Sequence, residues 1–392
     1  MHLTREEERI YCGEHGWASQ MCMKILIQLG DLFKADRLIP IRSAHVSGVS
    51  YKTLGDAPIE FLKVLADAGG RVKVRSTLNP QSFDPDQLGK KLPEHVRKRQ
   101  QAILDQFDRM GFKSSLTCTP YYLGKVEKGW HLAWAESSAV VYANSVLRAY
   151  TNREGGPSAL AAALIGKTPN YGVHQSENRK PSILVHVEDP LMNEMEHGTL
   201  GIYLGRILGD RIPFIEGLKK SSSEDLKQLG AGLAASGMTN MFLTEKTYSK
   251  SREPIEKVSV KAADIRKTCE ELSTNPGGQL DLVFVGCPHC SLREVKRIAR
   301  LVDGKKIRGQ LECWVCTSRY VKERAMEDVK RIEKAGARVL VDMCTIVSWT
   351  EKMGIKSIMT NSAKTAYYAP TLNRADTRLA SLEECLKTAF RG

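Results

Sequence analysis

A repeated alternation of short apolar runs and helix-periodic segments is the feature that most restricts the fold of this chain. In the last third, apolar runs at 280–286, 310–316, 338–343 and 355–360 each end in polar residues and precede a helical pattern. Repeated strand–helix units favour mostly parallel sheets covered by helices. Ligands of such sheets bind outside the carboxyl ends of the strands. The sequence therefore predicts an α/β fold of several parallel-sheet lobes, with an active site at strand carboxyl ends.

The N-terminal part repeats this pattern, with a predicted strand at 71–75, while the middle differs. The middle opens with Gly155-Gly156-Pro157, contains one clear strand at 182–187 and has a Ser-rich stretch at 219–225 that we interpret as a linker. A chain of 392 residues is too long for one small core, so more than one lobe is expected. We predict an α/β lobe over 1–154, an inserted lobe over 155–276 and a second α/β lobe over 277–392.

Charge and cysteine content restrict the setting. The N-terminus is acidic and polar rather than a signal peptide, and no apolar run reaches membrane-spanning length, so we expect a cytoplasmic protein without membrane contact. The net charge of +13 suits an anionic substrate or an acidic partner, or is simply a basic surface. The basic residues are scattered without a nucleic-acid-binding pattern, so we expect no nucleic-acid partner. Ten cysteines in a cytosolic chain are more often reduced, metal-bound or catalytic than disulfide-linked.

Three cysteines stand where predicted strands end. Cys287 follows a buried run and precedes a helical pattern, Cys118 follows 114–117, and Cys344 follows 338–343. Backbone N–H groups and the helix dipole lower thiol pKa values at such positions. Three thiolates on neighbouring loops can hold an iron–sulfur cluster and leave one coordination position open for substrate.

A structural zinc site is the alternative for the cysteines. Cys287-x2-Cys290 and Cys313-x2-Cys316 resemble a zinc ribbon in spacing. However, Cys313 and Cys316 lie in a strand pattern, where residues three apart point to opposite faces. We therefore prefer core packing for these two cysteines, and also for the four on helical patterns: Cys12, Cys22, Cys269 and Cys385.

Several turns at predicted strand ends suit an anionic ligand. Gly48-Val49-Ser50 is a turn that lets backbone approach a ligand, or simply a turn. Glu136-Ser137-Ser138 precedes an apolar helix expected from Ala139, so it is a helix cap, an anion-binding helix start, or both. Lys364 follows a strand end, which favours a substrate contact. The chain has no P-loop, no dinucleotide fingerprint and no nucleophile elbow, which argues against nucleotide-driven chemistry and ordinary hydrolysis.

Seven short segments together resemble the aconitase X family, and the match spans nearly the whole chain. They are His45-Val46-Ser47-Gly48, Thr77-Leu78-Asn79-Pro80, Cys118-Thr119-Pro120-Tyr121, Trp134 to Val140, Arg153 to Pro157, Gly286-Cys287-Pro288-His289 and Thr360 to Thr365. The resemblance implies an aconitase-like fold and an iron–sulfur-dependent hydro-lyase that dehydrates a small hydroxy acid. The clustered cysteine motif of ordinary aconitases is absent, so their ligand geometry does not transfer directly.

The resemblance also implies a reaction and a site. Archaeal members of the family dehydrate (R)-5-phosphomevalonate to trans-anhydromevalonate 5-phosphate in isoprenoid synthesis, which is the function we expect; bacterial relatives that dehydrate cis-3-hydroxy-L-proline are the alternative. We expect a [4Fe–4S] cluster on Cys118, Cys287 and Cys344, whose open iron acts as a Lewis acid. The expected substrate-lining residues are Gly48, Val49, Ser50, Asn79, Pro80, Ser138, Ala139 and Lys364.

The general base is missing from these segments. Elimination needs a base beside the substrate carboxylate, and ordinary aconitases carry a serine on a swivelling domain that we do not find in this sequence. Resemblance to the two-subunit branch of the family implies a small partner subunit that supplies this domain and its serine, in a heterodimer or a larger assembly. Ser50 or Ser138 as the base is the less favoured alternative, and a zinc-stabilised binding protein is the non-enzymatic one.

Overall fold

The computed structural model describes residues 1–112, 116–248 and 256–392. The chain forms two compact units, which are described separately below. Unit 1 comprises Met1–Ser82 and Pro93–Lys180, and unit 2 comprises Phe83–Leu92 and Pro181–Gly392. Among the described helices, none is both long enough and apolar enough to cross a membrane.

Unit 1 is built around a three-stranded parallel sheet with the order β3-β2-β4. The central strand β2 (Ser43–Val46) lies between β3 (Arg75–Leu78) and β4 (Leu132–Trp134). A small antiparallel pair, β1 (Leu38–Pro40) and β5 (Lys167–Pro169), lies beside it. The helices of unit 1 are α1 (Arg5–Cys12), α2 (Trp17–Leu32), α3 (Tyr51–Leu54), α4 (Ala57–Asp67), α5 (Glu94–Arg109), α6 (Ser137–Tyr142) and α7 (Gly156–Ile165).

Two predicted strands of unit 1 need comment. The strand expected at 71–75 is wrong, because β3 begins only at Arg75. The backbone N–H groups of Val72 and Lys73 bond instead to the carbonyls of Met110 and Ala163. Of the strand expected before Cys118, residues 114 and 115 lie outside the described residues, and Leu116 forms an isolated parallel bridge with Leu78.

Unit 2 contains a five-stranded, wholly parallel sheet with the order β13-β12-β10-β14-β15. Its centre is β10 (Leu282–Cys290), in which every residue is buried. The four strands predicted for this region are present, and β15 was missed. The other strands are β12 (Glu312–Thr317), β13 (Arg338–Val341), β14 (Ser357–Thr360) and β15 (Asp376–Leu379), with a short antiparallel pair β11 (Lys306–Ile307) and β16 (Phe390–Arg391).

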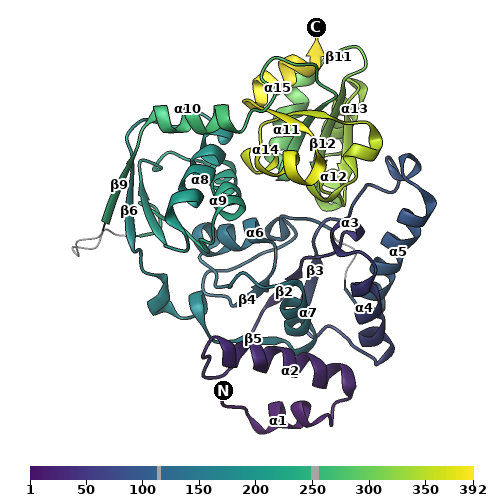
Figure 1. Cartoon of the computed structure of the whole chain (residues 1–392), viewed down its shortest axis with the longest axis vertical. Helices are drawn as coiled ribbons and strands as arrows, with labels where there is room; N and C mark the ends of the chain where they lie inside the picture. Colours follow the sequence, from purple (N-terminus) through teal and green to yellow (C-terminus); the bar gives the residue numbers. More distant parts are fainter. Residues whose placement is uncertain (113–115, 249–255) are drawn as a thin grey trace. The chain divides into compact units, whose positions relative to one another are not determined.

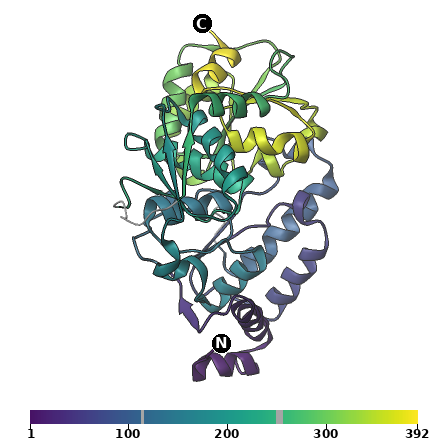
Figure 2. The ribbon, with the colours of Figure 1, turned by 60° about the vertical axis from the view of Figure 1, so that its left-hand side comes forward.

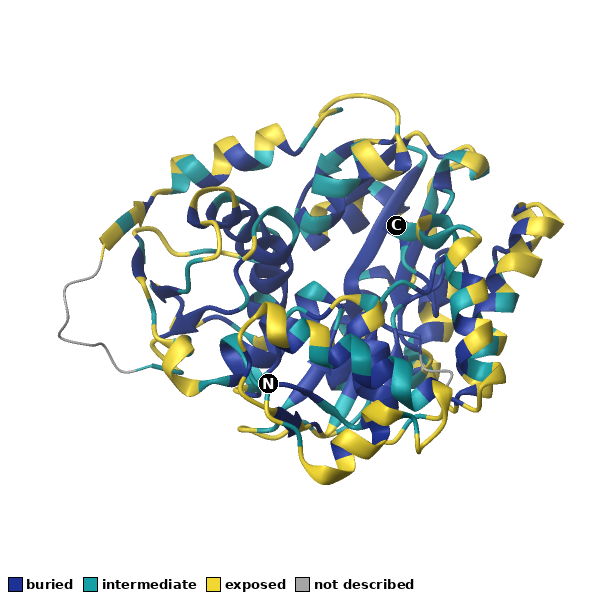
Figure 3. Ribbon diagram, turned by 60° about the horizontal axis from the view of Figure 1, so that its bottom comes forward, coloured by how far each residue is buried: buried dark blue, intermediate teal, exposed yellow. Residues whose placement is uncertain are grey.

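Helices cover this sheet, and their apolar faces make its core. Figure 1 shows α11, α12, α13 and α15 around the strands, and in Figure 3 the strands are dark blue while exposed positions fall mainly on helices and loops. One core cluster joins Val283, Val295, Ile298 and Val315. The helices are α11 (Leu292–Val302), α12 (Arg319–Arg324), α13 (Met326–Lys334), α14 (Ala363–Tyr368) and α15 (Leu382–Ala389).

The middle of the chain holds a second parallel sheet of unit 2, with the order β8-β7-β6-β9. The single strand predicted there was therefore an undercount. The elements are β6 (Ile183–Val187), α8 (Glu194–Leu208), β7 (Pro213–Glu216), α9 (Ser223–Ser236), β8 (Leu243–Thr244), β9 (Glu256–Val260) and α10 (Ala262–Glu271).

The linker predicted at 219–225 is also wrong in its second half. Ser222 is the N-cap of α9, and its hydroxyl accepts from the N–H of Asp225 in a capping box. Helix α9 packs along α8, as the views in Figure 1 and Figure 2 agree. The parallel α/β class itself is confirmed, because every strand pair in the three larger sheets is parallel.

Candidate active site

In unit 1, polar residues gather where β2, β3 and β4 end. The Gly48-Val49-Ser50 turn follows β2, Asn79 and Pro80 follow β3, and Ser138 with Ala139 follow β4. Gly48 has a φ of +77°, a conformation that L side chains rarely adopt, so the turn requires glycine. Because the three strands are parallel, their carboxyl ends share one edge of the sheet.

A chain of side-chain hydrogen bonds links these strand ends. His45 Nδ1 lies 2.8 Å from Thr77 Oγ1, and His45 Nε2 lies 3.2 Å from Asn79 Oδ1. Asn79 Nδ2 donates to Glu136 Oε2 at 2.8 Å, and Ser138 Oγ donates to Glu136 Oε1 at 2.8 Å. Two predicted substrate-lining residues, Asn79 and Ser138, are therefore held by the same carboxylate.

The acceptors in this hydrogen-bond network determine which ring nitrogen of His45 carries the proton. The Glu136 carboxylate only accepts, so the Asn79 amide turns its NH₂ toward it and its oxygen toward the imidazole. His45 Nε2 therefore carries the proton, and Nδ1 accepts from the Thr77 hydroxyl. Burial lowers the pKa of His45 to about 4, although Glu136 and Asn79 act in the opposite direction. His45 is neutral at neutral pH and orients Asn79.

Helix α6 begins at Ser137 rather than at Ala139, and in the cap expected at Glu136-Ser137-Ser138 the capping residue is the glutamate and not a serine. The N-cap is Glu136, whose side chain accepts from the N–H of Ser138 at 3.4 Å, and Ser138 already lies inside the helix. Ser138 and Ala139 are almost fully buried in unit 1. Ala139 carries no polar side-chain atom, so any contact it makes with an anion uses its backbone.

The Gly48-Val49-Ser50 turn is supported from α5. Gln100 Nε2 donates to the carbonyl of Val49 at 2.9 Å, and Gln100 Oε1 accepts from Ser82 Oγ at 2.8 Å. Because the Ser82 proton is used in that bond, Ser50 donates to Ser82 Oγ at 2.7 Å. Gln100 is 1% exposed, so these bonds form in a dry environment where a missing partner is costly.

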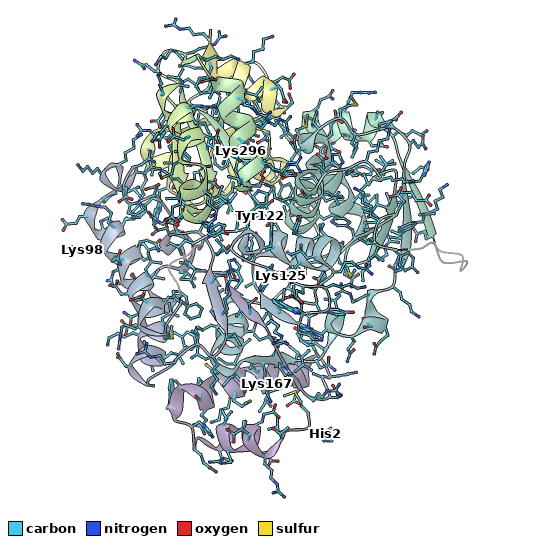
Figure 4. All side chains as sticks on the ribbon, turned by 180° about the vertical axis from the view of Figure 1, so that it is seen from behind. His2, Lys98, Tyr122, Lys125, Lys167 and Lys296 are labelled. Atoms are coloured by element: carbon cyan, nitrogen blue, oxygen red, sulfur yellow. The ribbon has the colours of Figure 1, made fainter. Side chains whose placement is uncertain are left out.

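Cys118 also belongs to unit 1. Cys118 is buried, with 6% of its surface exposed. The preceding residue, Thr117, donates its backbone N–H to the carbonyl of Leu78 at the end of β3. Two aromatic residues follow at Tyr121 and Tyr122, whose rings meet edge to face with their centres 4.7 Å apart; Tyr122 is labelled in Figure 4. Cys118 therefore lies at the same sheet edge as Asn79.

In unit 2, the backbone before Cys287 is sharply constrained. The parallel ladder between β10 and β12 runs through Val285 and then shifts register before Cys290. Gly286 has a φ of +108°, and a Cβ placed on it would overlap the carbonyl oxygen of Cys316. Only glycine fits this position, where the chain leaves the ladder and presents Cys287. The Cys287–Pro288 peptide bond is cis.

Cys287 and Cys344 are brought together in unit 2. A hydrogen bond with Cys344 lowers the pKa of Cys287, and Lys364, Thr365 and Ser362 lower it further, while burial acts in the opposite direction. Lys364 lies in the first turn of α14, where Ser362 is the N-cap and accepts from the N–H of Thr365 at 3.2 Å. Cys287 and Cys344, two of the three predicted cluster ligands, therefore lie together, and Lys364 interacts with Cys287. These surroundings favour the thiolate form of Cys287 over the thiol.

Two buried oxygens beside this group lack a protein partner. Among the described residues, Asn361 Oδ1 and Thr345 Oγ1 have no hydrogen-bond partner, although their residues are 5% and 0% exposed. Asn361 precedes Ser362, and Thr345 follows Cys344. Buried polar atoms left unpaired in a folded protein indicate a site for water, an ion or a ligand. Of the two atoms, the Thr345 hydroxyl can donate to an anion or a water, whereas Asn361 Oδ1 can only accept.

No complete metal site is visible in the described part of the chain. Within those residues, no three His, Cys, Asp or Glu side chains are grouped closely enough to hold a metal ion. The zinc-ribbon alternative is also not supported, because Cys290 and Cys313 pack in the apolar core of unit 2 and Cys316 is fully buried in β12. Burial raises the pKa of Cys313 to about 12.

Of the helical cysteines expected in cores, Cys22 and Cys385 are buried, whereas Cys12 is exposed and Cys269 half-buried.

Sequence reasoning missed Glu136 as the shared acceptor, His45 as an orienting group and Gln100 as a support. Gln100 had a detectable signal, because it occupies the apolar stripe Val96, Gln100, Ile103 and Phe107 of α5. A polar residue at a core position of a helix needs a buried partner. The roles of His45 and Glu136 depend on strand pairing, which no local pattern shows.

Comparison with known families covers almost the whole chain. Family models described as the aconitase X first, second and third domains match residues 1–177, 181–270 and 280–391. The crystal structure of Thermococcus kodakaraensis aconitase X in its holo-form is similar with a TM-score of 0.92 and 40% identity, covering 99% of this chain and 100% of that chain.

Individual relatives carry more specific names. The phosphomevalonate dehydratase large subunits of Methanocaldococcus jannaschii and Thermococcus kodakarensis are 44% and 41% identical to this chain. Each match covers 99% of this chain and 100% of the relative. The cis-3-hydroxy-L-proline dehydratase of Pseudomonas aeruginosa is 32% identical, over 100% of this chain and 70% of the relative.

Proposed function

The chain belongs to the aconitase X family, and on that premise we propose that it is the large subunit of a hydro-lyase acting on (R)-5-phosphomevalonate. The product is trans-anhydromevalonate 5-phosphate, an intermediate of an archaeal-type mevalonate pathway. The observation that carries this proposal is the full-length similarity to dehydratase large subunits at 44% and 41% identity. The more distant hydroxyproline dehydratase, at 32% identity, makes that activity the second candidate.

We propose Cys118, Cys287 and Cys344 as the ligands of a [4Fe–4S] cluster. In support, Cys287 and Cys344 are hydrogen-bonded to each other, and the pKa of Cys287 is lowered. The cluster, when bound, supplies a Lewis acid for the hydroxyl that leaves. The three thiolates would hold the cluster, and the cation of Lys364 lowers the pKa of Cys287 and so stabilises negative charge there.

The rest of the site binds and orients the substrate. Lys364 offers an ammonium to one of the two anionic groups of the substrate, its carboxylate or its phosphate. Asn79 and Ser138 are held in fixed orientations by their hydrogen bonds to Glu136, which leaves the second N–H of the Asn79 amide and an acceptor on the Ser138 hydroxyl. The Gly48-Val49-Ser50 turn and the start of α6 offer backbone N–H groups. Pre-formed donors of this kind reduce the cost of ordering a bound anion.

The general base belongs, in this proposal, to a small partner subunit. Loss of water removes a proton from the carbon beside the carboxylate and the hydroxyl from the next carbon. In unit 1 the Ser50 hydroxyl donates to Ser82, and the Ser138 hydroxyl donates to Glu136, so both are already used in fixed hydrogen bonds. The relatives are named large subunits, which implies a second chain. We propose that its swivelling domain carries a serine base.

Parallel assays of the two substrates test the function. The chain is co-expressed with the small subunit encoded in the same genome, loaded with iron and sulfide under anaerobic conditions, and given either 5-phosphomevalonate or cis-3-hydroxy-L-proline. We expect water loss from 5-phosphomevalonate only, and none from either substrate when the small subunit is omitted. Turnover of hydroxyproline without turnover of 5-phosphomevalonate would reject the proposed substrate, and full activity of this chain alone would reject the partner.

A further inference from the structure

Lys227 in α9 is a cation that lies almost wholly out of water. It is 1% exposed, and lysine is rarely buried to this degree without a partner. Its Nζ lies 2.5 Å from Glu294 Oε2 and donates to the carbonyl oxygen of His289 at 3.2 Å. The ion pair compensates the burial of the charge, and the remaining hydrogen bond fixes a backbone carbonyl two residues after Cys287.

His289 holds the other side of the same turn. Its Nε2 lies 2.8 Å from the carbonyl oxygen of Met343, and the residue is 1% exposed. A carbonyl oxygen only accepts, so Nε2 carries the proton and donates. Met343 directly precedes Cys344. His289 thus ties the segment that carries Cys287 to the segment that carries Cys344.

The far end of this arrangement is anchored by helix caps. Ser291 caps α11, its N–H donates to Glu294 Oε2 at 2.7 Å, and its hydroxyl lies 3.1 Å from Glu224 Oε1 in the first turn of α9. Lys227 lies one turn further along α9 and reaches the same Glu294 oxygen. The starts of α9 and α11 are therefore joined by buried polar contacts, and Lys227 extends them to the cysteine-bearing turn.

We propose that Lys227 and His289 are positioning residues that set the spacing between the Cys287 and Cys344 thiols. The inference rests on the proposed function only in taking these thiols as cluster ligands. Neither side chain is assigned a contact with the substrate; each acts through the backbone beside a ligand. Groups that hold metal ligands in place typically change metal affinity about 10–100-fold when they are removed.

A pair of substitutions at His289 separates a hydrogen-bonding role from a packing role. His289→Gln keeps an N–H donor that can reach the Met343 carbonyl, whereas His289→Leu keeps volume and removes the donor. We expect the leucine variant to lose iron to a chelator about 10-fold faster than the unchanged chain, and the glutamine variant to stay much closer to it. The apo form of the full chain gives an independent readout, the rate at which Cys287 and Cys344 are alkylated, quantified by peptide mapping. We expect the ratio of the two rates to change with leucine and to be restored with glutamine.

The role of Lys227 is tested in a double variant that also replaces Glu294, the carboxylate that pairs with it. Lys227→Met alone leaves the Glu294 carboxylate buried without its cation, a change that can prevent folding. The double variant Lys227→Met with Glu294→Gln removes both charges and keeps a polar side chain near Ser291. Lys246→Met is the control, because Lys246 also donates to a backbone carbonyl of unit 2, that of Ser221 at 2.8 Å, rather than to a carbonyl beside Cys287 or Cys344.

The results decide the inference separately from the function. The positioning role is supported if the double variant loses iron faster and shows an altered ratio of Cys287 to Cys344 alkylation, while Lys246→Met shows neither change. Unchanged iron loss and an unchanged ratio in folded His289→Leu and in the folded double variant would overturn it, even if the chain dehydrates 5-phosphomevalonate. Conversely, a failure to dehydrate 5-phosphomevalonate leaves the apo-thiol measurement valid.

Discussion

The side-chain amide of Asn79 donates a hydrogen bond to the carboxylate of Glu136, with 2.8 Å between Nδ2 and Oε2. This bond joins the end of β3 to the start of α6, and Ser138 donates to the other oxygen of the same carboxylate. Glu136 is 8% exposed, so the bonds are largely shielded from water. One acidic side chain therefore fixes two residues that we assign to substrate binding.

Replacing Glu136 should weaken substrate binding more than it weakens the fold. Glu136→Ala leaves the donors of Asn79 and Ser138 without the acceptor that orients them, and a loss of about 1–3 kcal/mol in substrate binding corresponds to a rise in KM of about 5- to 150-fold. Steady-state kinetics of the complex with the small subunit measure it. Glu154→Gln is the control, because Glu154 is a buried carboxyl of the same unit that bonds to Ser158 and Thr168 instead. A KM that rises equally in both variants would contradict the role of Glu136.

His45 makes the stability of unit 1 depend on pH. Burial lowers its pKa to about 4 in the folded chain, against about 6.5 when unfolded. Between these values the unfolded chain binds a proton that the folded chain does not, so stability is complete above pH 6.5 and falls as the pH drops toward 4. The loss from His45 alone is about 3 kcal/mol.

Denaturant unfolding between pH 7.5 and 4.5 measures this dependence. His174, whose pKa burial lowers to about 3, adds to the same slope. We expect His45→Gln to flatten the slope while leaving the part due to His174. Equal slopes for His45→Gln and the unchanged chain would show that His45 is not buried as a neutral group.

Gly286 should tolerate no side chain. In Gly286→Ala the new Cβ meets the carbonyl oxygen of Cys316, and φ of +108° adds backbone strain. We expect a loss of stability of about 2 kcal/mol or more, together with poor iron retention because Cys287 is displaced. Gly304→Ala is the matched control, since Gly304 has a φ of +72° with no heavy atom within 4 Å of the added Cβ. Similar melting temperatures for the two variants would argue against a steric role for Gly286.

Lys364 should matter for binding through its charge. Charged hydrogen bonds contribute about 1.5–3 kcal/mol, so Lys364→Ala should raise KM for 5-phosphomevalonate by about 10–100-fold. Lys356→Ala removes an exposed lysine from the same unit and should leave KM nearly unchanged. Val49→Ala should also change KM little, because Val49 is buried in the core of unit 1 and can offer only backbone to a ligand. A KM below twice the normal value in Lys364→Ala would remove this residue from the site.

The sequence predicted those parts of the fold that are determined by residues close together in the chain. The strand leading to Cys287 is a continuous apolar run followed by a helix with a serine cap, and both signals act within a few residues. The parallel arrangement follows from repeated strand–helix units. For the same reason the site could be expected at strand carboxyl ends, where Asn79 and Lys364 are found.

The parts that sequence missed have distant causes. At 71–75 the alternating charges and valines suggest a strand, but Val72 and Val74 pack against the main core of unit 1 and β3 begins only at Arg75. Thr77 then pairs with His45, 32 residues earlier, which local patterns cannot show. One error in the middle of the chain had a local cause. The capping box of Ser222 and Asp225 could be recognised in the sequence, but we interpreted its serine-rich surroundings as a linker.

Analysis of iron and acid-labile sulfide tests whether the strand-end cysteines hold an iron–sulfur cluster. The full chain is purified anaerobically, reconstituted, and compared with Cys118→Ser, Cys287→Ser, Cys344→Ser and the core control Cys313→Ser. We expect iron and sulfide in equal amounts in the unchanged chain and in Cys313→Ser, with marked loss in the other three variants. Stoichiometric zinc without labile sulfide, or full retention of iron in Cys287→Ser and Cys344→Ser, would contradict it.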